Sequence, residues 1–564
     1  RTSSYNELAF GTKSLWDMKQ VEIYRGAQSY AQGRNAIAGA VVMTSNDPTQ
    51  EWEGAAKLNM GNHRLAQTAA LISGPVVKDE LAFRLSVDHQ QRETAVDLPH
   101  YDPVGNPRWF KATNTRAKLL WTPSALPDLY SRLTFNHLNA RAPQSETELQ
   151  PNSPRYTPER PVFQTRSAST IWDIGYQLSE HWKWENKLVY THFIHDRKTT
   201  SPFNTALPPN RRGVPARVDG NEFQIEPIVK YENEKYRGLF GLFYFNAKQD
   251  ESVTMLNGRI ARTPITTNFN DKTKTKAAFG EITFTPDIPF ELTLSARYEQ
   301  EHHQRKGKSA MFSINRDKKY NVFLPKADIA WKINDDQRLG FKVGKGYNPG
   351  GAGVTFGVPY TSYEYDAEYV WNYELYHRWT SADKRLRINS NLFYNDYKDM
   401  QLPFTLGPNS IVIRNADKVV TYGAEINTEW QATEKLVLNA GIGMLKTDIK
   451  RYPNSGIEGN KLARAPSFSG KVGANYRLLD HLEIGTNYSY NSSYYSTADN
   501  LANGKVGHYD QLDVYLAYDF KHARITLYAD NVLNSRKDIL LVPRSGDITR
   551  QPERQIGVST ELRF

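Results

Sequence analysis

The sequence predicts an all-β protein, a 22-stranded antiparallel transmembrane β-barrel. Three observations point to this fold class. Apolar and polar residues alternate over many segments, short polar turns alternate with long loop segments, and only 39% of the 564 residues are apolar although aromatic residues reach 12%. A barrel wall that is one sheet thick, apolar outside and polar inside, accounts for all three observations.

Period-two alternation is the dominant pattern of the chain. Residues 81–88, 129–136, 386–394 and 512–520 each place apolar side chains at every second position. Alternation puts one set of side chains on one face of a strand and the other set on the opposite face. The last residues, from Gln555 to Phe564, alternate in the same way and end on an aromatic residue. These segments therefore predict strands that are buried on one face only.

Short polar turns recur every 40 to 55 residues, and longer polar segments such as 249–275, 302–320 and 397–421 lie between them. A barrel of this kind has short turns at one end and long loops at the other, whereas a sandwich does not. Ten turns and the longer connections give 22 strands. A β-propeller is the alternative, but each repeat here holds about two long strands, not four. The ten turns are Pro75–Glu80, Pro123–Asp128, Leu178–Trp182, Tyr231–Tyr236, Pro286–Phe290, Ile333–Arg338, Thr380–Lys384, Gln431–Lys435, Leu478–Leu482 and Asp519–Ala523.

Composition and motifs exclude several other classes. The chain has no Cys, and its longest clean apolar run, residues 36–43, is far shorter than the roughly 20 residues of a membrane-spanning helix. Catalytic signatures and nucleotide-binding loops are absent, so we expect neither an enzyme nor a cofactor. A net charge of +10 favours an anionic partner, but the basic residues are too dispersed for nucleic acid. The chain begins at Arg1, so we expect a mature or trimmed fragment.

Residues 1–50 do not alternate like the rest. Val-Glu-Ile-Tyr-Arg-Gly-Ala at 21–27, followed by Ala-Gly-Ala-Val-Val-Met-Thr at 38–44, resembles the end of the plug domain of TonB-dependent outer-membrane receptors. Ala27 stands where that family usually has Pro, and Ala38 stands where it has the first of two glycines. The resemblance implies that residues 1–50 are the C-terminal part of a plug and residues 51–564 the barrel. Most of the plug and its TonB box would then precede residue 1.

The barrel segment resembles the iron-complex branch of the same family. The motifs that carry the resemblance are Gly-Tyr-Asn-Pro-Gly-Gly at 346–351, Val-Trp-Asn-Tyr-Glu-Leu at 370–375, Asn-Asp-Tyr-Lys-Asp-Met-Gln at 395–401, Tyr-Gly-Ala-Glu at 422–425 and Asp-Asn-Val-Leu-Asn at 530–534. The resemblance implies a monomer in the outer membrane of a Gram-negative bacterium that captures and imports a ferric siderophore. TonB, lipopolysaccharide, and a phage or bacteriocin are the implied partners.

Other cargoes and another mode of transport remain open at this stage. Cobalamin, another small cofactor, haem or a metal chelate could replace the siderophore, and a passive porin-like channel is the alternative to TonB-dependent uptake. Without the energised plug segment, this chain alone is not expected to respond to TonB.

The resemblance also implies pairing between the plug and the barrel. Arg25 and Arg34 lie in the plug segment, and Glu374 and Glu425 lie at inward-facing positions of predicted strands. We expect Arg25 to bind Glu374 or Glu425. The alternative is that each side chain faces water in the lumen.

Tyrosine and arginine gather in the predicted loops. Aromatic rings offer flat apolar area and guanidinium groups offer forked donors for anionic oxygens, which suits a ferric siderophore. The alternative is ordinary polar loop residues or aromatic residues at the membrane interface. Glu301, His302 and His303 form the densest histidine cluster, and we expect a solvated pair there, not a metal site. The candidate ligand-binding residues are Arg211, Arg212, Tyr347, Tyr363, Tyr365, Arg414, Tyr494 and Tyr495.

Overall fold

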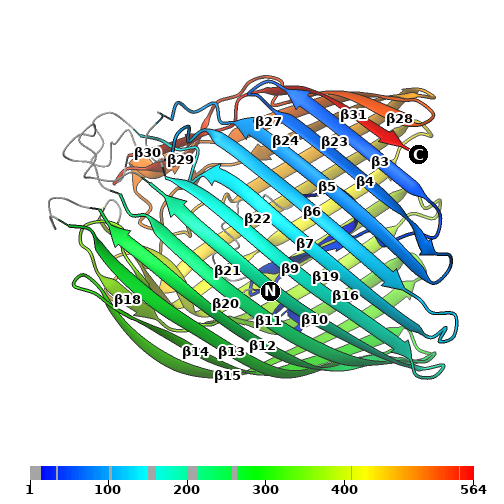
Figure 1. Ribbon diagram of the computed structural model, residues 1–564, viewed down its shortest axis with the longest axis horizontal. Helices are drawn as coiled ribbons and strands as arrows, with labels where there is room; N and C mark the ends of the chain where they lie inside the picture. The colour runs from blue at the N-terminus through cyan, green and yellow to red at the C-terminus, as the bar shows by residue number, and fades with distance from the viewer. Residues whose placement is uncertain are drawn as a thin grey trace.

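Alternating strands close into a barrel that forms the whole wall of the molecule (Figure 1). The computed structural model describes residues 14–32, 36–98, 100, 104–149, 161–199, 213–256, 263–407, 410–544 and 546–564. Within these residues the barrel has 22 antiparallel strands, and the first strand pairs with the last, Ala55 opposite Arg563. The predicted fold class is confirmed.

The barrel strands follow the order of the chain. They are β3 (Glu53–Gly61), β4 (Ala66–Val77), β5 (Leu81–Glu93), β6 (Trp109–Trp121), β7 (Leu129–Pro143), β9 (Val162–Gln177), β10 (Trp182–Lys198), β11 (Ala216–Glu232), β12 (Tyr236–Met255), β13 (Ile265–Phe284), β14 (Phe290–Lys308), β15 (Ser313–Asn334), β16 (Gln337–Asn348), β19 (Glu368–Thr380), β20 (Leu386–Gly407), β21 (Ser410–Gln431), β22 (Leu436–Arg451), β23 (Phe468–Leu479), β24 (Leu482–Asn491), β27 (Tyr509–Asp519), β28 (Ala523–Asp530) and β31 (Gln555–Arg563).

The two ends of the barrel differ as expected. Each of the ten predicted turns joins two neighbouring strands at one end, called the turn end here, and the longer connections gather at the opposite loop end (Figure 1). The predicted lengths of the loops were wrong. The segment 397–421 is almost entirely strand, because β20 runs to Gly407 and β21 begins at Ser410. Backbone pairing between these two strands continues beyond the roughly 9–11 residues that cross a bilayer.

The two faces of the wall have opposite chemistry. On β14, Leu292 and Leu294 face outward and are 37% and 46% exposed, whereas Arg297 and Glu299 face inward and are fully buried. Aromatic rings flank the outward apolar surface, as in the stack of Phe290 on Trp331 at the turn end. This is the pattern of a wall that lipid surrounds. The described residues include no helix long and apolar enough to cross a membrane.

Inward-facing glycines lie under aromatic rings of the neighbouring strand. Gly340 is directly opposite Tyr376, and a Cβ on Gly340 would lie 2.0 Å from that ring. Gly485 stands in the same relation to Tyr515, at 1.9 Å. The rings therefore lie flat on the wall in space that only glycine leaves free. The pairs of this kind are Gly175 and Tyr130, Gly220 and Phe193, Gly241 and Phe279, Gly340 and Tyr376, Gly485 and Tyr515, and Gly557 and Tyr528.

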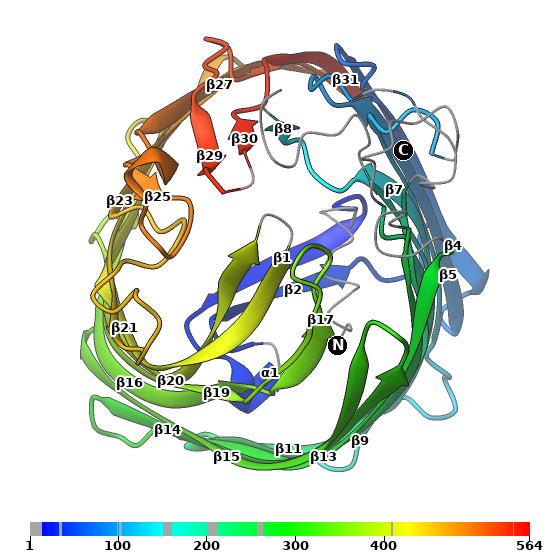
Figure 2. The same cartoon turned by 90° about the vertical axis from the view of Figure 1, so that its left-hand side faces the viewer.

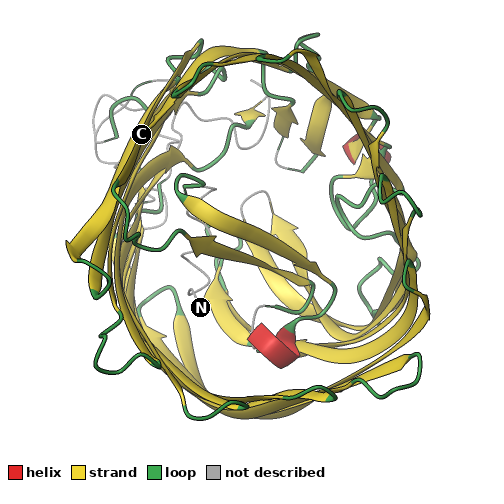
Figure 3. Cartoon of the chain, turned by 90° about the vertical axis from the view of Figure 1, so that its right-hand side faces the viewer, coloured by secondary structure: helices red, strands yellow, loops and turns green. Residues whose placement is uncertain are grey.

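The described residues that precede the barrel, 14–32 and 36–50, lie inside it (Figures 2 and 3). β1 (Met18–Arg25) pairs antiparallel with β2 (Gly39–Ser45), and a single helical turn, α1 (Ser29–Gln32), lies between them in sequence. The described residues 14–32 and 36–50 are called the inner segment below. The helical turn contacts β14, β15 and β16, so the inner segment rests against one side of the wall.

Three small sheets lie at the loop end. β17 (Gly351–Val354) and β18 (Ser362–Tyr365) form a hairpin that projects over the lumen (Figure 2). β25 (Tyr494–Tyr495) pairs with β26 (Lys505–Val506), next to the 3-10 turn η2 (Ala502–Gly504). β29 (Asp538–Val542), β30 (Asp547–Arg550) and β8 (Glu148–Leu149) form the third sheet. These sheets narrow the mouth of the barrel.

Candidate functional site

The inner segment is held to the wall by a buried ion pair at its first described residues. Arg84 of β5 donates hydrogen bonds from Nε and Nη2 to the two carboxylate oxygens of Asp17, at 2.7 and 2.5 Å. The side chains of Arg84 and Asp17 are only 5% and 1% exposed. Arg84 also binds Glu53, at the start of the first barrel strand. A forked pair shielded from water is strong because the dielectric screening around it is weak.

A second anchor holds the end of the inner segment. Arg132 of β7 donates from Nη2 to Asp47 at 2.9 Å, and Lys118 of β6 donates to Asp47 at 3.1 Å and to the Ser45 hydroxyl at 2.8 Å. Burial raises the pKa of Asp47, but the charges and hydrogen bonds of Arg132 and Lys118 outweigh it and hold the pKa below its usual value. Asp47 is therefore ionised at neutral pH, and it binds basic side chains of two neighbouring strands, β6 and β7.

A third contact involves the predicted plug and barrel residues. Arg25, at the end of β1, donates to the carboxylate of Glu425 on β21. Glu374 instead binds Lys342, its direct cross-strand neighbour, at 3.0 Å, and accepts a hydrogen bond from Asn391 at 2.7 Å. Arg34 lies outside the described residues. The Arg25 side chain is 58% exposed, so this pair is the most hydrated of the three anchors.

Tyr347 lies beneath the inner segment and not at the mouth. Its backbone N–H donates to the hydroxyl of Ser29 in α1 at 3.2 Å, its phenol donates to Glu299 of β14, and its side chain is fully buried. A ligand at the mouth cannot reach this ring while α1 covers it. Tyr347 is therefore not accessible from the mouth in this structure, and its part in ligand binding stays a prediction.

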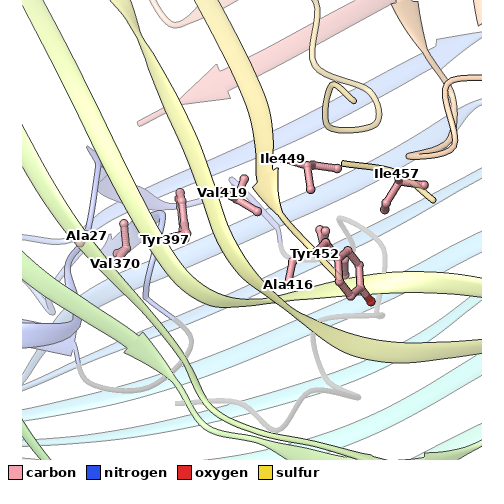
Figure 4. Close-up of a cluster of buried hydrophobic side chains, with 9 residues drawn as sticks. Ala27, Val370, Tyr397, Ala416, Val419, Ile449, Tyr452 and Ile457 are labelled. Atoms are coloured by element: carbon pink, nitrogen blue, oxygen red, sulfur yellow. The ribbon is translucent and has the colours of Figure 1, made fainter. Parts of the chain in front are cut away.

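A continuous apolar cluster connects the inner segment with the mouth (Figure 4). It begins at Ala27 and Val370, passes Tyr397 and Val419 on β20 and β21, and reaches Tyr452 beyond the end of β22. Tyr452 is 6% exposed, and its hydroxyl has no hydrogen-bond partner among the described residues. The Tyr452 hydroxyl is thus a buried donor that the described residues leave without a partner.

Tyr363 and Tyr365 lie in the β17–β18 hairpin over the lumen. Their rings stack at a centroid distance of 6.2 Å, and Arg316 of β15 fixes the hairpin by donating to the Tyr365 carbonyl at 3.1 Å. Burial raises the pKa of Tyr363 to about 12, so this phenol stays protonated as a donor at physiological pH. Both side chains are half-buried, which leaves part of each ring open.

The other candidate residues are spread around the mouth. Arg414 is exposed on β21, and its guanidinium lies 4.1 Å from the centre of the Phe404 ring. Tyr494 donates from its hydroxyl to the Ile539 carbonyl, and the ammonium group of Lys505 lies 5.4 Å from the centre of the Tyr495 ring. Arg211 and Arg212 lie outside the described residues. The hairpin of Tyr363 and Tyr365 contacts β21, the strand of Arg414, whereas Tyr494 and Tyr495 lie in the β25–β26 sheet.

The two adjacent histidines face opposite sides of β14. His302 lies 2.6 Å from the Asp317 carboxylate on the outer face, and His303 lies 3.5 Å from Asp271 on the inner face. Alternation along a strand keeps the two rings from sharing a ligand. Among the described residues there is no group of three or more histidine and acidic side chains that could hold a metal ion.

A cavity of about 810 Å³ lies along the wall where the last strands meet the first. Lys57 on β3, Arg524 and Asp530 on β28, and Glu561 on β31 line it together with loop residues such as Arg536. Its wall carries charges of both signs and many hydroxyl and amide groups. The lumen beside the first and last strands, where the barrel closes, is therefore polar and hydrated.

Sequence reasoning missed the two strongest anchors. Asp17 and Arg84 are 67 positions apart, and no local pattern connects them. The alternation of β5 does place Arg84 on the inward face, which is the one signal that marks it as a lumen residue. Tyr452 was missed because it lies beyond its strand.

Comparison with known proteins identifies a protein family that this chain matches. The sequence profile described as "TonB dependent receptor-like, beta-barrel" matches residues 110–534. The pesticin receptor of Yersinia pestis is 22% identical over 306 residues, which are 52% of this chain and 44% of that protein, so the match spans less than half of the curated relative.

Two solved structures share the fold. The ferric yersiniabactin uptake receptor of Yersinia pestis superposes with a TM-score of 0.82 at 18% identity, covering 97% of this chain and 85% of the other. A siderophore receptor of Acinetobacter baumannii superposes with a TM-score of 0.79 at 13% identity, covering 97% and 86% of the two chains. At these identities the likeness concerns the fold.

Proposed function

Because this chain belongs to the family of TonB-dependent receptor-like β-barrels, we propose that it captures a ferric siderophore at the outer membrane of a Gram-negative bacterium and imports it with TonB. The family and its fold are those of receptors and transporters. The observation that carries the proposal is the inner segment, which is tied to the lumen wall through Asp17, Arg25 and Asp47. A passive channel needs an open lumen, whereas an energised importer needs an obstruction that can be released.

The two parts of the chain take separate roles in this proposal. Residues 1–50 act as the C-terminal part of a plug and residues 51–564 as the barrel. TonB would act on the plug, and pulling on it would have to break the anchors of the inner segment. The Arg25–Glu425 pair is the most exposed of these anchors and therefore the easiest to separate.

The mouth supplies groups that suit an anionic chelate. Arg414 and the arginines at 211 and 212 offer forked donors, and Tyr363, Tyr365, Tyr494 and Tyr495 offer aromatic area. We add Tyr452 to this set because its buried hydroxyl lacks a partner in the described structure. Tyr347 enters the proposal only after the helical turn α1 has moved away from it.

A second role is docking of a bacteriocin. A pesticin receptor is among the relatives of this chain, and the strands extend far beyond the membrane at the loop end. Long, paired strands give a large protein a rigid surface to bind. Uptake of cobalamin, another cofactor, haem or a metal chelate is the alternative for the small-molecule cargo.

The test is binding of a panel of ferric siderophores to the full-length receptor, followed through tryptophan fluorescence. We expect saturation at nanomolar concentration by one class among catecholates, hydroxamates and carboxylates. Arg414→Ala is expected to weaken that binding by about 10-fold to 100-fold, the effect of one charge-assisted hydrogen bond. Lys446→Gln, on the outer face of β22, is the matched control and is expected to leave the affinity unchanged. Absence of binding across all three classes would refute a siderophore cargo and direct the search to cobalamin and other cofactors.

A further inference from the structure

One buried arginine of the lumen wall has an unused donor group. Arg297 lies on the inward face of β14, and its side chain is fully buried. Its Nε and Nη2 both donate to one oxygen of Glu299, Oε1, at 3.2 and 3.1 Å. Its Nη1 is buried as well but donates to no acceptor among the described residues. A buried cationic donor without an acceptor is costly, so this atom marks a position where an acceptor can bind.

Aromatic rings lie beside this guanidinium group. Its Cζ is 5.3 Å from the centre of the Phe243 ring and 5.1 Å from the centre of the Phe279 ring. Phe279 lies directly opposite Arg297 across the β13–β14 ladder, and Phe243 lies on β12. A ring face attracts the cation, but it is a much weaker acceptor than an oxygen atom. The position therefore combines an unused donor with flat apolar surface.

The charge of Arg297 is already balanced by its neighbour. Glu299 is fully buried beside it, and the second oxygen of Glu299 accepts a hydrogen bond from the Tyr347 phenol. A carboxylate ligand at Nη1 would lie close to Glu299 and would be repelled, because screening in the interior is weak. A neutral oxygen, such as the carbonyl of an amide, accepts from Nη1 without that repulsion. The chemistry therefore favours a neutral carbonyl group attached to an aromatic ring.

The inner segment covers this part of the wall. Helical turn α1 contacts β14, β15 and β16, and the Ser29 hydroxyl accepts a hydrogen bond from the Tyr347 backbone at 3.2 Å. α1 carries no charged residue, so no ion pair holds it to the wall. The ionic anchors of the inner segment bind other strands: Asp17 binds β5, Asp47 binds β6 and β7, and Arg25 binds β21. Once those anchors separate, little holds α1 over Tyr347 and the inner face of β14.

We propose that Arg297 forms a second ligand position in the lumen, which opens when the inner segment leaves the wall and takes a neutral carbonyl group attached to an aromatic ring. Nη1 donates to the carbonyl oxygen, and the Phe243 and Phe279 rings contact the aromatic ring of the ligand. β14 continues for about 37 Å beyond Arg297, up to Lys308, so a ligand reaches this position only after it has left the mouth. The inference rests on the proposed import function, because import requires release of the inner segment.

The test uses the full-length receptor in detergent and a variant in which the inner segment is released. In this released variant, Asp17→Asn and Asp47→Asn remove two ionic anchors, and Ser29→Phe places a ring where α1 meets the Tyr347 backbone. Leu324→Cys introduces a thiol at a fully buried position of β15, in the same apolar cluster as Tyr347. We expect maleimide to label this thiol at least about tenfold faster in the released variant than in the otherwise wild-type chain. Equal rates would overturn the proposal, because α1 would then not be the cover.

The probe is 4-fluorobenzamide, which joins a neutral carbonyl to an aromatic ring and is followed by fluorine NMR. The released variant is expected to bind it at least about tenfold more tightly than the wild type does. Arg297→Lys keeps a charge beside Glu299 but has no second nitrogen for the ligand. In the released variant it is expected to weaken binding by about 10-fold to 100-fold, the effect of one charge-assisted hydrogen bond. The matched control is Arg116→Lys on β6, an arginine that donates to Asn136 and is expected to leave probe binding unchanged.

Two further arms test the charge argument and the folding of the variants. The carboxylate 4-fluorobenzoate is expected to bind the released variant at least about tenfold more weakly than the amide does. R297Q/E299Q removes both charges together and is expected to lose amide binding as Arg297→Lys does. Migration of unheated samples in gels verifies that each variant forms a closed barrel. Tighter binding of the carboxylate, unchanged amide binding in both Arg297 variants, or an equal loss in Arg116→Lys would each overturn the proposal.

Siderophore binding at the mouth separates this inference from the proposed cargo. Arg297→Lys in the otherwise wild-type chain is expected to bind a siderophore as the wild type does, because α1 still covers the Arg297 position. If the wild type binds no siderophore but the amide pattern holds, the cargo proposal fails and the Arg297 position stands. If a siderophore binds but the released variant takes no amide, the Arg297 proposal fails and the cargo proposal stands.

Discussion

Asp17→Asn is predicted to loosen the inner segment while leaving the barrel intact. The residue has a backbone φ of 59°, a conformation that Asn adopts as readily as Asp, so the substitution removes charge without straining the chain. Arg84 would then keep the Glu53 carboxylate but lose the anion that both its Nε and Nη2 contact.

The magnitude follows from the burial of the pair. Removing one partner of a buried pair costs about 3–5 kcal/mol, and the remaining Glu53 places the cost near the lower limit, about 3 kcal/mol. Because 1.4 kcal/mol corresponds to a factor of ten, the open form of the inner segment should become about 150-fold more populated.

A single thiol reports this opening. The chain has no Cys, so Ala69→Cys introduces one thiol on β4, at a wall position that is 2% exposed and packs against Trp16 beside Asp17. The rate of maleimide labelling at increasing urea concentration measures how often residues 14–18 lift off the wall. In the Ala69→Cys background we expect Asp17→Asn to raise this rate by about 150-fold.

The control is Glu22→Gln, which neutralises a carboxylate of the same inner sheet that binds Gln20 and Tyr24. It is expected to change the labelling rate by less than about threefold. A rate for Asp17→Asn within about threefold of its parent, with the barrel still closed, would refute the argument that the buried pair holds the inner segment.

Three other perturbations test the remaining contacts. Glu425→Gln removes the partner of Arg25, but because that arginine is 58% exposed, we expect a cost below about 1 kcal/mol and a labelling change below about fivefold. Asp47 has a lowered pKa, so the stability it contributes is present above the unfolded value of about 3.8 and is lost as pH falls through the lower folded value. Relative to an exposed control thiol labelled at the same pH, which corrects for the loss of thiolate in acid, the labelling rate should therefore stay constant from pH 8 to pH 5 and rise below about pH 3.8, a step that Asp47→Asn removes. Gly340→Ala would bring a Cβ within 2.0 Å of the Tyr376 ring, and we expect about 1–3 kcal/mol of barrel destabilisation, measured by the temperature at which the barrel unfolds in gels.

The sequence predicts the barrel well because alternation repeats along the whole chain. Each strand that crosses the membrane must bury one face in lipid. The order of apolar and polar residues therefore shows where the strand lies and which of its positions face inward. The same reasoning places Glu374 and Glu425 on the inner face but cannot choose between them. The choice depends on register, since Lys342 lies directly opposite Glu374 and neutralises it.

The candidate site follows less directly from the sequence. Tyr347 belongs to a motif that is easily recognised, yet its burial depends on Ser29, more than 300 positions earlier. Strand lengths above the membrane were also underestimated, because β20 continues as a strand through Pro403 to Gly407, residue types that are typical of loops. Contacts of this kind form only when the chain folds and distant segments meet, so local sequence patterns do not predict them.

The flat aromatic rings over the inward glycines have a consequence for movement through the lumen. A tyrosine that stood upright from the wall would obstruct a sliding segment and would offer it a free phenol. Instead, the Tyr376, Tyr515 and Tyr528 hydroxyls bind Asp328 of β15, Glu483 of β24 and Asn59 of β3. These three rings therefore lie out of the path of a segment that moves through the lumen.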